Sequence, residues 1–212
     1  MKNTLIPLWI ATGNTAKAKE LLDLSNNFFS QFHPAISREP KGVIEDEPTF
    51  LGNAKIKAHA LVRELIAEGY SCFAVLADDS GLCVDILNGS PGVYSGRYSG
   101  FGSNSQKNVE KLLSELSKVA PDLTKRRASY HCALYFIEVL DGKISKEFSA
   151  EGIREGLIGT EPKGAHGYAY DAVFLDTQTF LSYGEISYEE KQKDSHRSRA
   201  FKELQNLLKT SI

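Results

Sequence analysis

Two adjacent carboxylates stand at the end of an apolar run near the middle of the chain. Residues 72–77 have the composition of a buried strand, and Asp78 and Asp79 follow directly. Because neighbouring side chains of a strand point to opposite faces, one acid can face a binding site while the other supports the backbone. Buried carboxylates are typical of metal binding or proton transfer. The Asp-Asp-Ser-Gly order also favours a hairpin turn, and both interpretations stay open at this point.

A phosphate site is predicted near the N-terminus, where a strand-like run (residues 5–11) leads into a glycine-containing turn and a helical pattern. Free backbone N–H groups at the start of a helix attract anions, and a lysine there adds a point charge. The pattern is not a Walker A loop, and many such units hold no ligand. The residues of this candidate site are Thr12, Gly13, Asn14, Thr15, Ala16 and Lys17.

An acidic loop precedes the second predicted helix. Residues 39–48 are polar, and Glu45, Asp46 and Glu47 offer the oxygen ligands that suit a hard cation. The same run also fits a solvated loop whose charge favours the helix dipole. Apolar residues at helical spacing predict a helix from residue 50 to residue 65. Asn53 is a poor helix former within it, which suggests a role for its side chain.

The remaining elements alternate between strand and helix patterns, which predicts one α/β domain over residues 1–212 with a mixed sheet. Gly81 predicts a tight turn followed by a second strand. Asp141-Gly142 predicts a hairpin between two long strands. Other expected elements are a short strand at residues 32–36, a helix at 104–116, strands at 129–139 and 144–153, and a last helix that begins near Ser195.

Composition limits the class of protein. The 212 residues carry 25 basic and 27 acidic side chains, a formal net charge of −2, which argues against a nucleic-acid-binding protein. Three cysteines in apolar contexts indicate buried thiols in a reducing compartment. We find neither a signal-peptide layout nor a transmembrane span, so we expect a soluble, cytoplasmic protein that does not bind membranes.

The sequence resembles the inosine triphosphate pyrophosphatases, also called dITP/XTP or noncanonical purine pyrophosphatases. The resemblance runs from the first strand to the last helix, with five motifs in the family's order. They are Thr12-Gly13-Asn14 with Lys17; Thr49-Phe50 with Asn53-Ala54 and Lys57-Ala58; residues 77–82 with 91–95 and Arg97; residues 167–171; and Glu190-Lys191 with Ser195-His196-Arg197.

This resemblance implies an elongated, bent mixed sheet flanked by helices, two lobes with a central active-site cleft, and a homodimer. It implies Mg²⁺-dependent hydrolysis of ITP, dITP or XTP to the monophosphate and pyrophosphate. Asp79 would be the catalytic base, and Glu45 and Asp79 would bind the metal. Lys57 and Ser80 join residues 12–17 as phosphate or substrate ligands. The base-binding residues would be Tyr168, Ala169, Tyr170, Asp171, Lys191, His196 and Arg197.

Four departures from the family pattern bear on these roles. Ala169 and Ala172 replace a usual glycine and a usual proline, and Gly52 replaces a usual glutamate. The acidic loop lacks the common glycine, so Asp46 and Glu47 compete with Glu45 for the metal. Two rival functions stay open: a catalytically silent nucleotide-binding protein, and a related pyrophosphatase of another base specificity.

Overall fold

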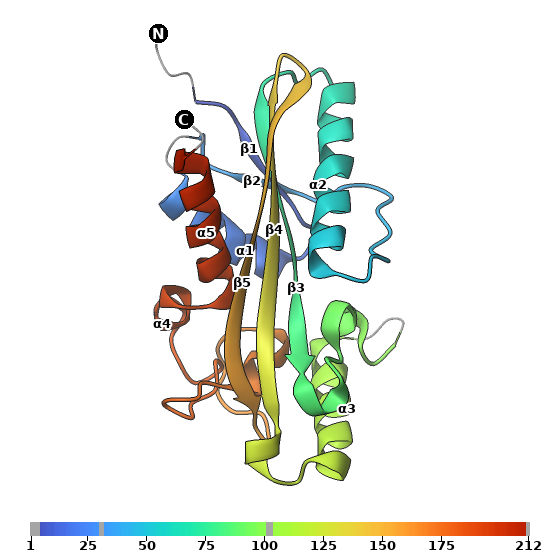
Figure 1. Ribbon diagram of the computed structural model, residues 1–212, viewed down its shortest axis with the longest axis vertical. Helices are drawn as coiled ribbons and strands as arrows, with labels where there is room; N and C mark the ends of the chain where they lie inside the picture. The colour runs from blue at the N-terminus through green and yellow to red at the C-terminus, as the bar shows by residue number, and fades with distance from the viewer. Residues whose placement is uncertain (1–4, 30–31, 101–103, 211–212) are drawn as a thin grey trace. The chain divides into compact units, whose positions relative to one another are not determined.

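The computed structural model describes residues 5–29, 32–100 and 104–210. The helices are α1 (Thr15–Phe28), α2 (Phe50–Ala67), α3 (Ser105–Val119), α4 (Tyr188–Lys193) and α5 (His196–Thr210). The strands are β1 (Leu8–Ala11), β2 (Ile36–Arg38), β3 (Phe73–Val84), β4 (Arg127–Leu140), β5 (Lys143–Ile158) and β6 (Phe174–Leu175). Short 3₁₀ helices lie at Asp85–Leu87 (η1), Gly92–Arg97 (η2), Leu123–Lys125 (η3) and Ala169–Ala172 (η4) (Figure 1).

The described strands form one mixed six-stranded sheet in the order β2-β1-β3-β4-β5-β6. Strand β1 runs parallel to both neighbours, with Ile10 beside Leu76 of β3. Strand β6 is antiparallel to β5. The predicted hairpin is confirmed: Asp141 and Gly142 join β4 to β5, and both have positive φ, at 50° and 71°. That conformation suits the twist of an antiparallel pair.

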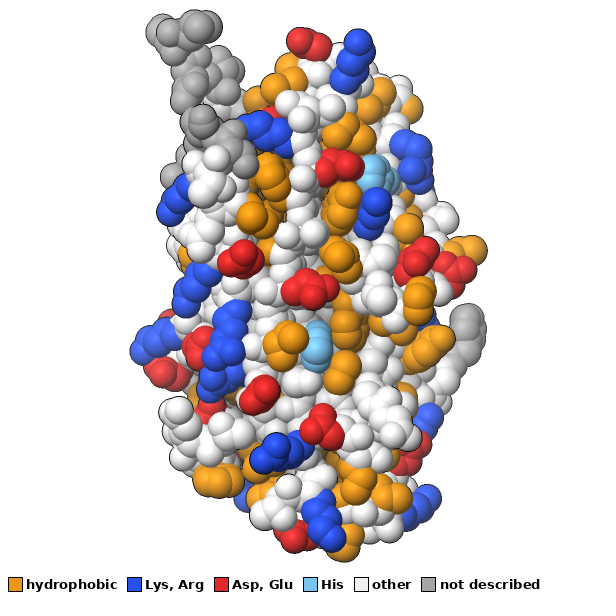
Figure 2. Space-filling view, in the orientation of Figure 1, with side chains coloured by type: hydrophobic (Ala, Val, Ile, Leu, Met, Phe, Trp, Pro, Cys, Tyr) orange, Lys and Arg blue, Asp and Glu red, His pale blue; other side chains and the backbone are white. Residues whose placement is uncertain are grey.

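The chain divides into two compact units. Unit 1 contains Met1–Asp79, Cys132–Gly152 and Arg197–Ile212, and unit 2 contains Ser80–His131 and Ile153–His196. Strands β3, β4 and β5 each pass from one unit to the other along the chain. On the face drawn in Figure 2, acidic and basic side chains are interspersed, in keeping with the small net charge.

In unit 1, helices cover both faces of the sheet. Helices α1 and α5 pack on one face and α2 packs on the other (Figure 1). Side chains of β3 alternate between these cores: Ala74 and Leu76 pack with α1 and α5, whereas Val75 and Ala77 pack with α2. This period of two places Asp78 and Asp79, the next two residues, on opposite faces.

In unit 2, α3 packs against the end of β3 and the start of β4. Leu112 and Leu116 are fully buried there with Leu82, and Tyr130 and Phe174 continue the same core. Asn104 caps α3 by accepting the N–H of Lys107. The predicted helix is therefore confirmed, and it runs three residues further than its apolar pattern suggested.

Two predicted elements are wrong. Gly81 makes no turn, because β3 is a single twelve-residue strand that runs through Asp78, Asp79 and Gly81. Hydrogen bonding of β3 to its neighbouring strands outweighs the local turn preference of the Asp-Asp-Ser-Gly segment. The strand predicted at residues 32–36 lies later, at Ile36–Arg38, while Phe32 makes only an isolated bridge to Ile6.

Candidate active site

Asp78 is the centre of a buried charge network in unit 1. Its carboxylate accepts a hydrogen bond from the Lys17 ammonium at 2.9 Å and lies 3.5 Å from Nε of Arg197. The thiol of Cys132 donates to its second oxygen at 3.1 Å. Arg197 also pairs with Glu20 of α1 at 2.6 Å. Asp78 thus joins the start of α1 to the start of α5, which is a structural task.

Asp79 enters a second cluster on the α2 face. Its Oδ1 lies 3.4 Å from the Lys57 ammonium, which also binds Glu45 at 2.8 Å. Its Oδ2 accepts from the Asn53 side chain at 3.1 Å. Two acids that are 34 residues apart in the sequence therefore share one ammonium group. Of the three acids in the loop, Glu45 is the one that pairs with Lys57, whereas Asp46 and Glu47 are exposed.

The two neighbouring aspartates titrate in opposite directions. Burial alone would raise the pKa of Asp78, but the charges of Lys17 and Arg197 hold it well below its ordinary value. Burial raises the pKa of Asp79, and the nearby Glu45 and Asp78 carboxylates add to this rise, while the charges of Lys57 and Lys17 oppose it. Asp78 is therefore a fixed anion, and Asp79 is the more basic carboxylate.

The N-terminal loop forms a helix start as predicted. Asn14 is the N-cap of α1, and its side chain accepts the N–H of Lys17 at 3.0 Å. The hydroxyl of Thr12 accepts the N–H of Asn14. The N–H groups of Thr15 and Ala16 point out of the first turn, where no carbonyl of the helix can accept them. The exposed Glu39 carboxylate lies against Gly13, where any Cβ would collide with it.

In unit 2, Asp171 and Lys191 form a buried ion pair. Their side chains meet at 2.8 Å and are both 3% exposed. Asp171 also accepts the Tyr130 hydroxyl at 3.2 Å and the N–H of Tyr168 at 2.9 Å. The Lys191 ammonium lies 5.7 Å from the centre of the half-buried Tyr168 ring. Three groups, the Lys191 ammonium, the Tyr130 hydroxyl and the Tyr168 N–H, thus converge on one carboxylate.

Comparison with known proteins decides the family. A model of the Ham1 family matches residues 8–207, nearly the whole chain. The chain belongs to the Ham1 family. A dITP/XTP pyrophosphatase of Clostridium perfringens is 39% identical over 204 residues, covering 94% of this chain and 96% of that protein. A dITP/XTP pyrophosphatase of Escherichia coli is 34% identical over 200 residues, covering 94% and 96%.

Solved structures of Ham1 proteins share the fold. A HAM1 protein from Coxiella burnetii has a TM-score of 0.79 and 27% sequence identity, covering 97% of this chain and 100% of that one. A Staphylococcus aureus Ham1 protein has a TM-score of 0.78 and 30% identity with the same coverage. The mixed sheet flanked by helices that the resemblance implied is therefore the fold of this Ham1 family member.

Several of the predicted base-binding residues are deeply buried. Tyr170 is 2% exposed and donates its hydroxyl to the carbonyl of Ser95, so its position suits the core. The His196 ring stacks on Tyr130, with centroids 4.7 Å apart, and Arg197 is 3% exposed. Ala169 has φ of +56°, the strained conformation anticipated where alanine replaces glycine. Ser80 follows Asp79 in β3 and is half-buried.

Reasoning from the sequence missed Glu20 and Cys132. Glu20 lies beside Leu21 and Leu24 on the buried side of α1 and is 4% exposed. A carboxylate within an apolar helix stripe signals a buried partner, but the partner, Arg197, is 177 residues away. Cys132 is one of three cysteines, and no sequence signal distinguishes its contact with Asp78.

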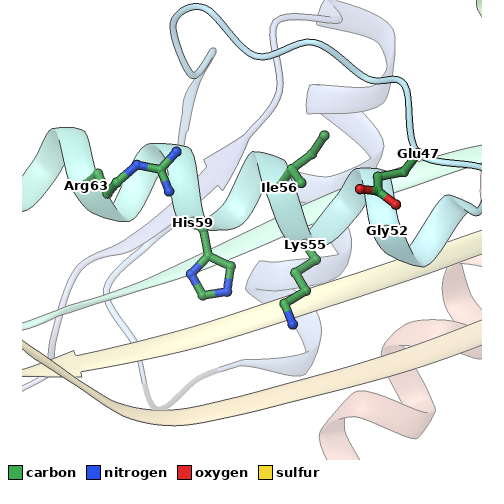
Figure 3. Close-up of a pocket in the computed structure, with 6 residues that line it drawn as sticks. All are labelled: Glu47, Gly52, Lys55, Ile56, His59 and Arg63. Carbon is green, nitrogen blue, oxygen red and sulfur yellow. The ribbon is translucent and has the colours of Figure 1, made fainter.

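A separate groove of about 440 Å³ lies along the outer side of α2. Figure 3 shows Lys55, His59 and Arg63 spaced along the helix, with Glu47 near one end. Within residues 5–29, 32–100 and 104–210, no group of three or more His, Cys, Asp or Glu side chains is arranged to hold a metal ion. In the same residues, no helix combines the length and the apolar character needed to cross a bilayer.

Proposed function

We propose that this chain is a Mg²⁺-dependent pyrophosphatase that converts noncanonical purine nucleoside triphosphates (ITP, dITP and XTP) to monophosphate and pyrophosphate, and so cleans the nucleotide pool. Membership of the Ham1 family and relatives named dITP/XTP pyrophosphatases support the reaction. The observation that carries the proposal is the shared contact of Glu45 and Asp79 with Lys57.

The acid cluster, which consists of Glu45 and Asp79 around Lys57, suits a magnesium ion. Mg²⁺ is usually bound by one or two carboxylates, with phosphate oxygens and water as its other ligands. Glu45 and Asp79 provide two carboxylates at one point, and Lys57 is the cation that they share in this structure. Bound there, Mg²⁺ supplies positive charge to the phosphate oxygens and makes water more acidic.

Asp79 is the proposed general base. Of the two adjacent acids, Asp78 is held by Lys17 and Arg197. Asp79 lies beside Glu45 and Lys57, and Asn53 holds one of its oxygens. It takes a proton from water as the water oxygen bonds to the α-phosphorus. The bond from that phosphorus to the oxygen bridging the α and β phosphates breaks, and pyrophosphate leaves with the electron pair. A positioned base of this kind typically contributes about 10²–10⁴-fold to the rate.

The phosphate chain is proposed to lie at the start of α1. Lys17 pairs with Asp78 and Lys57 pairs with Asp79, and the positive charge of each lysine lowers the pKa of Asp79. The N–H groups of Thr15 and Ala16 are oriented to bind a phosphate oxygen. Because Glu39 is exposed, an approaching phosphate would displace its carboxylate from Gly13 into solvent.

The proposed contacts with the base use hydrogen-bond donors. Tyr168 offers a ring for stacking, and Lys191 is held beside it by Asp171. Arg197 and His196 are the proposed donors to the 6-keto group of hypoxanthine or xanthine, which adenine replaces with an amino group. The Arg197 guanidinium carries five N–H donors, and Glu20 and Asp78 are among its partners. Recognition by hydrogen bonds of this kind can separate the kcat/KM values of two substrates by about 10⁴-fold.

A panel of nucleoside triphosphates with Mg²⁺ tests the function. We expect ITP, dITP and XTP to yield monophosphate and pyrophosphate much faster than ATP or GTP. Release of orthophosphate, or nucleotide binding with no product, would overturn the proposal, and the second result would identify a silent binding protein. The proposal includes a cytoplasmic homodimer, which light scattering and cell fractionation would test.

A further inference from the structure

Asn53 is an unusual residue to find inside a helix. It is the fourth residue of α2 and is 1% exposed, although asparagine favours neither helix interiors nor burial. A buried amide is stable only where its polar atoms find partners. The contacts of Asn53 therefore explain why an asparagine occupies this position.

The Asn53 amide joins the acidic loop to Asp79. Its Oδ1 accepts the N–H of Glu47 at 3.1 Å, and its Nδ2 donates to the Glu47 carbonyl at 3.4 Å. Nδ2 also donates to Oδ2 of Asp79 at 3.1 Å. The side chain thus pairs with one residue of the loop as a neighbouring strand would. Aspartate has the same shape but cannot donate these bonds, and alanine can make none of them.

Gly52 allows the loop to lie this close. A Cβ at residue 52 would be 2.8 Å from Cβ of Glu47 and 3.0 Å from its Oε2, which is too near for the loop to stay in place. Figure 3 shows Glu47 beside Gly52 at the start of α2. The amide of Asn53 and the missing side chain of Gly52 therefore act together to dock the loop on the helix.

We propose that Asn53 is a positioning residue that fixes the acidic loop, and with it Glu45, relative to Asp79, and thereby sets the affinity of the site for a divalent cation. This inference rests on the proposed function. Glu45 is two residues before the clamped Glu47, and Lys57 is one helical turn after Asn53. Without the clamp, the loop must be ordered when the cation binds, and this lowers affinity. Groups that orient metal ligands typically change affinity about 10–100-fold.

Asn108 of α3 provides a matched control. It is also a buried helical asparagine, at 3% exposure, and it also clamps a loop. Its Nδ2 donates to the carbonyls of Ser95 and Gly96, and its Oδ1 accepts the N–H of Ser99. These contacts all lie in unit 2, and none involves Glu45 or Asp79. Asn108→Ala therefore removes a buried asparagine and its loop contacts without touching Glu45 or Asp79.

The experiment measures Mn²⁺ binding without nucleotide, by the electron paramagnetic resonance signal of free Mn²⁺. We expect Asn53→Ala to weaken the Mn²⁺ Kd about 10–100-fold relative to wild type, and Asn108→Ala to leave it unchanged. Raising Mg²⁺ should restore most of the kcat of Asn53→Ala, which a general loss of folding would not permit. Equal Mn²⁺ affinity in folded Asn53→Ala and wild-type proteins would overturn the inference.

Gly52→Ala keeps the test decisive if Asn53→Ala does not fold. It pushes the loop away from α2 while Asn53 is retained, so it should also weaken Mn²⁺ binding. Unchanged affinity in Gly52→Ala, or no Mn²⁺ binding by the wild type, would likewise overturn the inference. The proposed function is tested separately, by measuring pyrophosphate release from ITP. An enzyme that releases pyrophosphate at the same Mg²⁺ requirement with or without the clamp would refute only the positioning role.

Discussion

Asp78 and Asp79 are adjacent in β3, yet their carboxylates lie on opposite faces of the sheet, and their pKa values shift in opposite directions. The Lys17 ammonium lies 2.9 Å from Asp78, whose pKa is lowered. Asp79 lies 3.4 Å from Lys57, and its pKa is raised. One residue therefore stabilises the fold through its charge, and its neighbour keeps a charge that the fold does not favour. Substitution by asparagine separates these two effects.

Asp78→Asn should destabilise the protein strongly. It removes the carboxylate that Lys17 and Arg197 share, and breaking such a buried pair typically costs about 3–5 kcal/mol. Because the folded-state pKa of Asp78 is lowered, its stabilising effect is present above its ordinary pKa of 3.8 and is lost as the pH falls below that value. Urea unfolding at several pH values would measure the difference from wild type. A variant as stable as wild type at pH 7 would contradict the assignment.

Asp79→Asn should abolish most turnover without loss of stability. The pKa of Asp79 is higher in the folded protein than in the unfolded chain, so above its unfolded-state pKa the ionised carboxylate lowers the free energy of unfolding. Asparagine carries no charge and removes that penalty. We expect an unchanged or higher Tm without metal, and kcat for ITP reduced at least about 10²–10⁴-fold. Pyrophosphate release and thermal unfolding check both parts. Hydrolysis of ITP at the wild-type rate would refute the role of Asp79.

Local patterns predicted the elements that lie on either side of the acid cluster. The apolar spacing of α2 correctly predicted that the helix begins at Phe50. Thr49 caps this start by accepting the N–H of Gly52. The alternation of β3 correctly predicted that its two aspartates face opposite ways. The low helix propensity of Asn53 correctly indicated a side-chain role. Each of these features is determined by residues within one element.

Long-range partners could not be predicted in the same way. The turn expected at Gly81 failed because pairing within the sheet, which depends on distant residues, outweighs the local preference of four turn-forming residues. Arg197 was expected to contact the base, and no pattern in the sequence indicated its pairs with Glu20 and Asp78. Tyr170, expected at the base, lies in the core of unit 2. No pattern in the sequence specifies which charges or rings meet after folding.

Arg197→Ala should narrow the preference for ITP over ATP. It removes the proposed donor to the 6-keto group, and it also leaves Glu20 without the ion pair at 2.6 Å. The ratio of kcat/KM for ITP to that for ATP does not depend on the fraction of enzyme that is folded, so it separates specificity from stability. We expect this ratio to fall at least about tenfold, a small part of the roughly 10⁴-fold discrimination that recognition by hydrogen bonding can reach. An unchanged ratio would exclude Arg197 from base recognition.

Ala169→Gly should stabilise the protein. Ala169 has φ of +56°, and a left-handed conformation costs an L-residue about 1–2 kcal/mol, whereas the greater freedom of unfolded glycine costs about 0.5–1 kcal/mol. The expected gain is about 0.5–1 kcal/mol in the free energy of unfolding, measured in urea. Gly167→Ala is the matched control: its φ is +73°, and a Cβ there would collide with the Asp171 carboxylate, so it should destabilise. A loss of stability in Ala169→Gly would mean that contacts of the alanine methyl group outweigh its backbone strain.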